Sequence, residues 1–273
     1  MSGMVRPLVR LRKIGSPAWR PDLIITDWDE TVTSEDTIKL VAQVPYDNND
    51  NLEPKFQYFT DIYLASYKKY VAEFYQQYGN RDSLDKEILF QRGMKQVELS
   101  SVTALANHKI FANLSENQFA RQASNIKLRP GFVDCFRSIQ KLNIPIVILS
   151  INWTSILIKQ ALRDAGLDCD YANFLVNEFE FDDNHITTGN WVETPSIRTA
   201  LDKLELTKQL IANSTNSVYL GDSSTDLLSL LHVDTGIIIP DTSLAKSIQN
   251  YAFAKDKLYL GTWHDLHNLL TST

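Results

Sequence analysis

One segment near the start of the chain changes abruptly from apolar to acidic residues: Leu23-Ile24-Ile25-Thr26-Asp27-Trp28-Asp29-Glu30-Thr31-Val32-Thr33. The apolar part predicts a short strand that is buried on both faces, as the strands of a parallel sheet are. If the extended geometry continues, Asp27 and Asp29 point the same way, because side chains two positions apart share one face of a strand. Two carboxylates at the end of a buried strand repel each other and lose their hydration, so they need a neutralising partner.

A divalent cation is a suitable partner for this acidic pair. Carboxylate oxygens are the ligands that Mg²⁺ prefers, and open α/β folds bind their ligands at the carboxyl edge of the sheet. The segment therefore predicts a magnesium-assisted acidic site at that edge. A loop with two solvated aspartates is the alternative, since short motifs also match by chance.

Size and composition limit the classes of protein. The chain has 273 residues, enough for one large α/β domain or for a core with a subdomain. Its formal net charge of −6 argues against a nucleic-acid partner. Cys135 and Cys169 form no CxxC pair, so we expect neither a disulfide framework nor a zinc site. No apolar run is long enough to cross a membrane, and we expect a cytoplasmic protein without a membrane partner.

The first 20 residues differ from the rest in charge. Residues 1–20 carry several arginines and no acid, a composition that can direct a protein to mitochondria. Pro7, Gly15 and Pro17 interrupt any long amphipathic helix there. We therefore expect a flexible tail, with mitochondrial targeting as the alternative. The sequence indicates no oligomeric state.

Residues 36–126 predict an all-helical cap subdomain, inserted behind the first strand. A helix over 37–43 and a polar loop over 45–51 precede a helix with an aromatic stripe, and a further helix follows over 83–106. We expect most of the stripe to be core packing, although one or two of its tyrosines could line a pocket. The stripe consists of Phe56, Phe59, Tyr63, Tyr67, Tyr70, Phe74 and Tyr78.

Strands and helices alternate from residue 127 onward, which is typical of a doubly wound parallel sheet of the Rossmann-like type. Residues 21–35 and 127–273 therefore form the predicted α/β core, and 177–189 predict a β-hairpin. The expected strands of the sheet after the first lie at 144–149, 171–176, 217–220, 236–239 and 257–260.

Polar residues follow three of these strands where each strand ends. Asp27 and Asp29 follow the first, Ser150 follows the second, and Asp222 and Asp226 follow a third. The carboxyl ends of parallel strands meet at one edge of the sheet. Carboxylates, a hydroxyl and the ammonium of Lys203, which lies between the last two strands, can therefore converge.

These segments resemble, in the same order, the four motifs of the haloacid dehalogenase superfamily. The motifs are the stretch 27–33, then Ser150, Lys203 and the stretch 221–226, and the resemblance covers about residues 22–240. The helical block is similar to the cap that these enzymes insert after the first motif. Arg129-Pro130-Gly131 and the hairpin resemble the phosphoserine phosphatase-like branch, and the stretch 221–228 with the aromatic cap resembles thiamine monophosphate phosphatase-like members.

The resemblance implies a role for each residue. Asp27 would attack phosphorus and form an aspartyl-phosphate, and Asp29 would protonate the leaving alcohol and then take a proton from water. Mg²⁺ would be held by the side chains of Asp27 and Asp222 and the backbone oxygen of Asp29, with Asp226 acting through water or supporting a ligand. Ser150 and Lys203 would bind the phosphoryl oxygens.

Several of these assignments have alternatives. Lys208 competes with Lys203, which the family pattern favours. Asp36 would contact the substrate or simply lie near a helix N-terminus, and Trp153 would line the pocket or simply pack in the core.

Ser150 could instead cap a helix, and Asp226 could be an acid favoured by the dipole of a helix N-terminus. Mg²⁺ is the expected cofactor and a small phosphorylated metabolite the expected partner.

The expected function is a Mg²⁺-dependent phosphomonoesterase, with thiamine monophosphate as one candidate substrate. A non-catalytic phosphate- or metal-binding regulatory protein on the same fold is the first alternative. The second is a phosphotransferase, which passes the phosphoryl group to an acceptor other than water.

Overall fold

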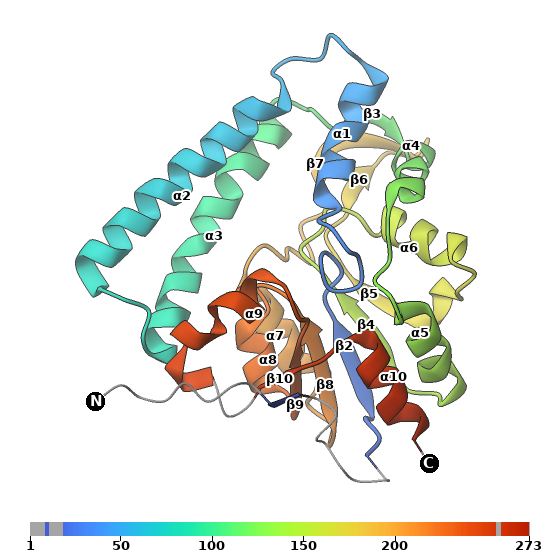
Figure 1. Ribbon diagram of the computed structural model, residues 1–273. Coiled ribbons are helices and arrows are strands. Elements are labelled where there is room, and N and C mark those ends of the chain that lie inside the picture. The colour runs from blue at the N-terminus through green and yellow to red at the C-terminus, as the bar shows by residue number, and fades with distance from the viewer. Residues whose placement is uncertain (1–8, 11–18, 255–257, 273) are drawn as a thin grey trace.

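The computed structural model describes residues 9–10, 19–254 and 258–272. Its centre is a parallel sheet of seven strands in the order β1-β10-β9-β8-β2-β4-β5. The first strand of the core, β2, therefore lies inside the sheet, between β8 and β4 (Figure 1). The strands are β1 (Val9–Arg10), β2 (Leu23–Thr26), β4 (Ile146–Leu149), β5 (Ala172–Leu175), β8 (Ser217–Gly221), β9 (Thr235–Ile238) and β10 (Leu258–Leu260).

Helices cover both faces of this sheet, which confirms the predicted doubly wound fold. Alternate residues of β2 point to opposite faces: Ile24 joins the core beneath α5, α6 and α10, whereas Leu23 and Ile25 join the core beneath α7, α8 and α9. All four residues of β2 and of β4 are buried. The helices are α5 (Phe132–Lys141), α6 (Ser155–Asp164), α7 (Ala200–Leu210), α8 (Leu227–His232), α9 (Ser243–Ser247) and α10 (Trp263–Thr271).

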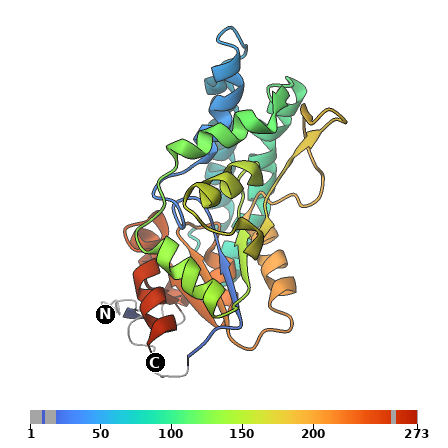
Figure 2. The ribbon, with the colours of Figure 1, turned by 90° about the vertical axis from the view of Figure 1, so that its right-hand side faces the viewer.

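A second body rises from the carboxyl edge of the sheet, as the side view in Figure 2 shows. Two long helices, α2 and α3, run side by side from the top of the molecule down to α9 (Figure 1). The aromatic stripe of α2 packs partly against α3, with Phe74 and Phe90 at a ring distance of 5.1 Å. This body contains α1 (Ile38–Asn48), α2 (Phe56–Tyr78), α3 (Leu84–Asn107), β3 (Ala112–Ser115) and α4 (Glu116–Ala120).

The chain leaves the core and returns to it at one place. Thr33 forms an antiparallel bridge with Leu128. Backbone hydrogen bonds flank the bridge on both sides, from Ser34 N–H to Lys127 O and from Arg129 N–H to Val32 O, each 2.8 Å long. The two connections between the bodies therefore lie side by side.

The inserted segment also contains a strand, where the sequence predicted helices alone. β3 pairs with β7 (Ile186–Trp191), and β7 pairs with β6 (Phe179–Phe181), so the predicted hairpin carries a third strand. β3 has only four residues, too few for a clear pattern, and Asn113 within it has a φ of +64°. Its partner is also far away in the sequence, so no local pattern predicts the pairing.

Two other expectations are wrong locally. The predicted loop over 45–51 begins too early, because α1 continues through Pro45 to Asn48. Proline lacks the N–H that a helix interior needs, but Val44 and Pro45 are buried, and their packing offsets the lost bond. Val9 and Arg10, expected in a flexible tail, pair with Tyr259 and Leu260. The rest of the tail before residue 19 lies outside the described residues.

Candidate active site

The carboxylate of Asp27 lies at the carboxyl end of β2, almost completely buried at 4% exposure. One oxygen, Oδ1, accepts a hydrogen bond from the Trp28 N–H (2.7 Å), and the other, Oδ2, lies 2.8 Å from the Lys203 ammonium nitrogen. The chain turns at once, because the N–H groups of residues 31–33 all donate to the Trp28 carbonyl. Glu30 takes the left-handed conformation that this turn requires, with a φ of +53°.

Lys203 reaches this carboxylate from the first turn of α7. Thr199 and Asp202 form a capping box that fixes the start of the helix. The Lys203 ammonium is fully buried and lies 2.8 Å from both Asp27 and Asp226. Burial alone would lower the pKa of Lys203, but Asp226 and Asp27 outweigh it and raise the pKa above its ordinary value. Lys208, the competing lysine, is exposed on the same helix.

Asp222 and Asp226 lie in the loop that follows β8. Asp226 Oδ1 accepts hydrogen bonds from Lys203 and from the Tyr219 hydroxyl (2.9 Å), while Oδ2 accepts them from the N–H groups of Asp222 (3.1 Å) and Ser223 (3.2 Å). Both oxygens of Asp226 are thus occupied in holding Lys203 and the loop. Among the described residues, the Thr31 hydroxyl alone donates to Asp222 Oδ1 (3.1 Å), so this carboxylate keeps free acceptor capacity close to Asp27.

The three carboxylates form a group that fits a divalent cation. One oxygen from each of Asp27, Asp222 and Asp226 lies within 4.8 Å of the others. Lys203 is the one ammonium in contact with them in the described part of the chain, so two negative charges are in excess when all three carboxylates are ionised. Burial and the neighbouring Asp226 raise the pKa of both Asp27 and Asp222. Oxygen donors with this excess charge suit Mg²⁺.

The carboxylate of Asp29 is held apart from this group. Its Oδ1 accepts hydrogen bonds from the N–H and the hydroxyl of Thr37, and its Oδ2 accepts one from the Asn152 amide (3.0 Å). Burial raises the pKa of Asp29 to about 6, and Asp36 adds to this shift. A carboxyl group with a pKa near neutrality can both donate and accept a proton. Metal binding by the Asp29 backbone oxygen stays a prediction.

Ser150 follows β4, the neighbour of β2 in the sheet, and is fully buried. Its hydroxyl oxygen accepts a hydrogen bond from the Asn152 N–H (3.0 Å). Within the described part of the chain, no group accepts a hydrogen bond from this hydroxyl, so its proton remains available to a ligand. The Asn177 amide holds the loop by donating to the carbonyls of Ile151 and Asn152.

A cavity of about 420 Å³ separates the cap from this site, and both Asp36 and Trp153 line it. Each of the two also has the structural role that the sequence left open. Asp36 accepts a hydrogen bond from the Ile38 N–H (2.8 Å) at the start of α1. Trp153 packs against Phe111 at a ring distance of 5.6 Å. Neither residue contacts the three carboxylates through a hydrogen bond or an ion pair.

Sequence reasoning missed four residues around this site. Asn152 and Thr37 hold Asp29, and the only signal for them was their position next to recognised segments. Glu98 and Arg198 line the cavity from α3 and from the loop before α7. They lie outside every motif, so only the folded arrangement identifies them.

Comparison with known proteins places the chain in a family. A family model described as haloacid dehalogenase-like hydrolase matches residues 24–230. "Cold tolerance protein 1" of Saccharomyces cerevisiae is 30% identical over 263 residues, covering 83% of this chain and 82% of that protein. "Bifunctional TH2 protein, mitochondrial" of Arabidopsis thaliana is 26% identical and covers 85% of this chain, which spans 42% of that longer protein.

The fold is shared with solved structures as well. One solved structure, "Phospho-Aspartyl Intermediate Analogue of Phosphoserine phosphatase", matches this chain with a TM-score of 0.51. The match covers 90% of this chain and 94% of that protein. The identity is 13%, so this likeness concerns the fold alone. The family model extends from β2 to α8 and includes all four segments around the buried lysine. The chain belongs to the haloacid dehalogenase-like hydrolase family.

Proposed function

We propose that this hydrolase is a Mg²⁺-dependent phosphomonoesterase that forms an aspartyl-phosphate on Asp27. The observation that supports the proposal most directly is the position of the Asp27 carboxylate, 2.8 Å from a buried ammonium and next to the open carboxylate of Asp222. Asp29, held by Thr37 and Asn152, supplies an acid two residues away. A nucleophile, a cation and an acid–base group thus share one edge of the sheet.

The reaction proceeds in two steps. In the first, an oxygen of Asp27 attacks phosphorus, the bond from phosphorus to the leaving oxygen breaks, and Asp29 gives its proton to that oxygen. In the second, Asp29 takes a proton from water as the water attacks phosphorus, and the bond to Asp27 breaks. Lys203 opposes the rise in the pKa of Asp27 and so favours its ionised form, and the Ser150 hydroxyl donates to a phosphoryl oxygen.

Asp27 and Asp222 would hold Mg²⁺ in this scheme, with Asp226 holding the loop and Lys203 in place. The ion, when bound, offsets the negative charge of the phosphoryl group. No other group in the cluster can supply this charge, because Lys203 already faces two carboxylates.

The proposed substrate is a small phosphorylated metabolite, with thiamine monophosphate as one candidate. The cavity of about 420 Å³ falls in the range of small-molecule sites, roughly 300–1,000 Å³. Aromatic rings line it, which suits a substrate with a flat ring. The stretch 221–228 and the aromatic cap resemble thiamine monophosphate phosphatase-like members, and this resemblance favours the candidate.

Hydrolysis of para-nitrophenyl phosphate with Mg²⁺, and again after removal of metal with EDTA, tests the proposal. We expect turnover that depends on the metal and is lost in Asp27→Asn, a near-isosteric change that removes the nucleophilic charge. Asp85→Asn, on the exposed surface of α3, is the matched control and should retain full activity.

Other outcomes would identify the alternatives. Turnover by a folded Asp27→Asn protein would refute the nucleophile. Absence of turnover with Mg²⁺, Mn²⁺ and Co²⁺ would favour a non-catalytic binding protein. Transfer of phosphate to an added alcohol in preference to water would identify a phosphotransferase.

A further inference from the structure

The cavity beneath the cap is lined by residues of both bodies. Ile151 and Thr225 are among them, and they are the sequence neighbours of Ser150 and Asp226. Phe56, Phe59 and Trp153 form apolar walls. Glu98, Tyr63 and Arg198 line the same cavity. A substrate whose phosphate lies at Asp27 would therefore extend its leaving group toward these three polar side chains.

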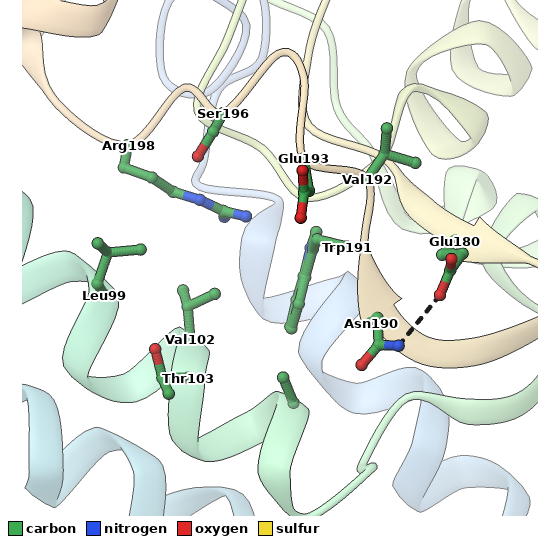
Figure 3. A pocket seen from close by; sticks show the side chains of 11 residues that line it. Leu99, Val102, Thr103, Glu180, Asn190, Trp191, Val192, Glu193, Ser196 and Arg198 are labelled. Carbon is green, nitrogen blue, oxygen red and sulfur yellow. Dashed lines mark hydrogen bonds between the residues drawn. The ribbon is translucent and has the colours of Figure 1, made fainter.

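Arg198 is unusual because it is a buried cation with donors that lack partners. Its side chain is 6% exposed, and its Nε and Nη1 atoms are buried with no hydrogen-bond acceptor among the described residues. Burial lowers the pKa of Arg198 to about 10, so the guanidinium stays charged at neutral pH. Figure 3 shows Arg198 from a neighbouring pocket, which it also lines, with its guanidinium directed toward Trp191 at 5.5 Å from the ring centroid. Leaving such donors unpaired is costly, and a ligand atom that accepts hydrogen bonds would remove this cost.

Glu98, on α3 of the cap, lines the cavity beneath the cap together with Arg198. Its carboxylate accepts a hydrogen bond from the Tyr63 hydroxyl (3.2 Å). Burial raises the pKa of Glu98 to about 7, and the positive charge of Arg198 opposes this shift, so the two side chains interact electrostatically. Neither a hydrogen bond nor an ion pair of 4.0 Å or less joins these two described side chains. An acceptor on the cap and a donor on the core thus line one cavity, together with apolar side chains.

We propose that Glu98 and Arg198 form a specificity site for the leaving group, and that this group is a nitrogen heteroaromatic ring bearing an amino substituent. The ring nitrogen would accept a hydrogen bond from Arg198, and the amino group would donate to Glu98. The faces of the ring would lie against the aromatic walls. An aliphatic alcohol of similar size offers neither the flat faces nor the paired acceptor and donor. This inference rests on the proposed phosphatase function.

The preference should be strong because buried polar groups are left unpaired by the wrong ligand. Loss of one such partner in a binding site usually reduces binding roughly 10- to 100-fold. The test is the ratio of kcat/KM for an aminopyrimidine phosphate to kcat/KM for O-phosphoserine. Thiamine monophosphate and cytidine monophosphate are the two aminopyrimidine probes, because they present similar rings from different classes of metabolite.

We expect the wild type to prefer at least one aminopyrimidine probe by tenfold or more. Glu98→Gln and Arg198→Lys should each lower the ratio roughly 10- to 100-fold, mainly through KM. Glu73→Gln on α2 and Arg92→Gln on α3 are matched controls on exposed positions of the cap and should leave the ratio within twofold. Arg198→Lys keeps the charge, and a melting curve of each variant verifies that it folds.

A second measurement is independent of phosphate chemistry. Free thiamine or cytidine should bind to the wild type in calorimetry, and at least tenfold more weakly to Glu98→Gln. The inference is overturned if the kcat/KM of the wild type for O-phosphoserine equals its kcat/KM for both ring phosphates. It is also overturned if the two variants lower kcat/KM for all three substrates by the same factor. Absence of hydrolysis of any phosphate would instead refute the proposed phosphatase function, and binding of the free ring compounds would still test the site.

Discussion

Replacement of Lys203 by methionine gives a direct test of the charge balance around Asp27. Methionine has a similar length but no charge, so the change leaves three buried carboxylates without their ammonium. Removing one partner of a buried ion pair costs about 3–5 kcal/mol, because the other charge stays buried without compensation. Lys203 faces two carboxylates at 2.8 Å, so we expect a loss in the free energy of unfolding near the upper end of this range.

Urea denaturation in the presence of EDTA measures this loss without a contribution from bound metal. Lys208→Met removes an exposed lysine from the same helix and should change the free energy of unfolding by less than about 0.5 kcal/mol. The double variant with Asp226→Asn should recover about 1–3 kcal/mol relative to additive effects, since the two side chains are in contact. A loss below about 1 kcal/mol in Lys203→Met, or strict additivity with Asp226→Asn, would refute the reasoning.

Three further changes test other parts of the structure. In Gly221→Ala the added Cβ would lie 2.5 Å from the Cβ of Asp226, so we expect a loss of about 1–3 kcal/mol in urea denaturation and weaker activity with para-nitrophenyl phosphate. Lys95→Met breaks the 2.8 Å contact between Lys95 on the cap and the Asp202 carboxylate on the core. We expect kcat/KM to fall about threefold to tenfold because the cap would be held less firmly over the site; an unchanged value would show that this contact does not hold the cap. Hydrogen bonds from Ser214 and Thr215 lower the pKa of Asp22 to about 2. Because the folded pKa lies below the ordinary 3.8, Asp22 stabilises the fold above pH 4 and loses this effect between pH 4 and pH 2. Asp22→Asn should therefore cost about 0.5 kcal/mol at pH 7, a figure reduced for solvent exposure, and the difference from wild type in urea should vanish near pH 2.

The sequence predicts the sheet well because its strands are short apolar runs between polar segments. Leu23–Thr26 and Ile146–Leu149 are completely buried, so their sequences carry a strong signal. The site residues follow from the same rule, since Asp27, Ser150 and Asp222 each come directly after a strand. The parallel arrangement then places them at one edge.

Other features depend on contacts that no local pattern encodes. The pairing of β3 with β7 joins segments more than 70 positions apart, with Thr187 Oγ1 receiving the Leu114 N–H at 2.9 Å. Arg198 lies on the core and Glu98 on the cap, and neither is part of a periodic pattern of apolar residues that predicts a helix or a strand. Their common position is a result of how the cap packs on the core, which sequence periodicity does not describe.

The side-by-side connections between the two bodies have a consequence for the timing of catalysis. Thr37 lies just beyond this crossing, at the entrance to α1, and it supplies both hydrogen bonds to Asp29 Oδ1. If the cap rotated about this pair of connections, Thr37 would move with it, and Asp29 would lose the two hydrogen bonds that orient its carboxylate. In such an open state Asp29 could not take a proton from water, so hydrolysis of the aspartyl-phosphate on Asp27 would wait until the cap returns.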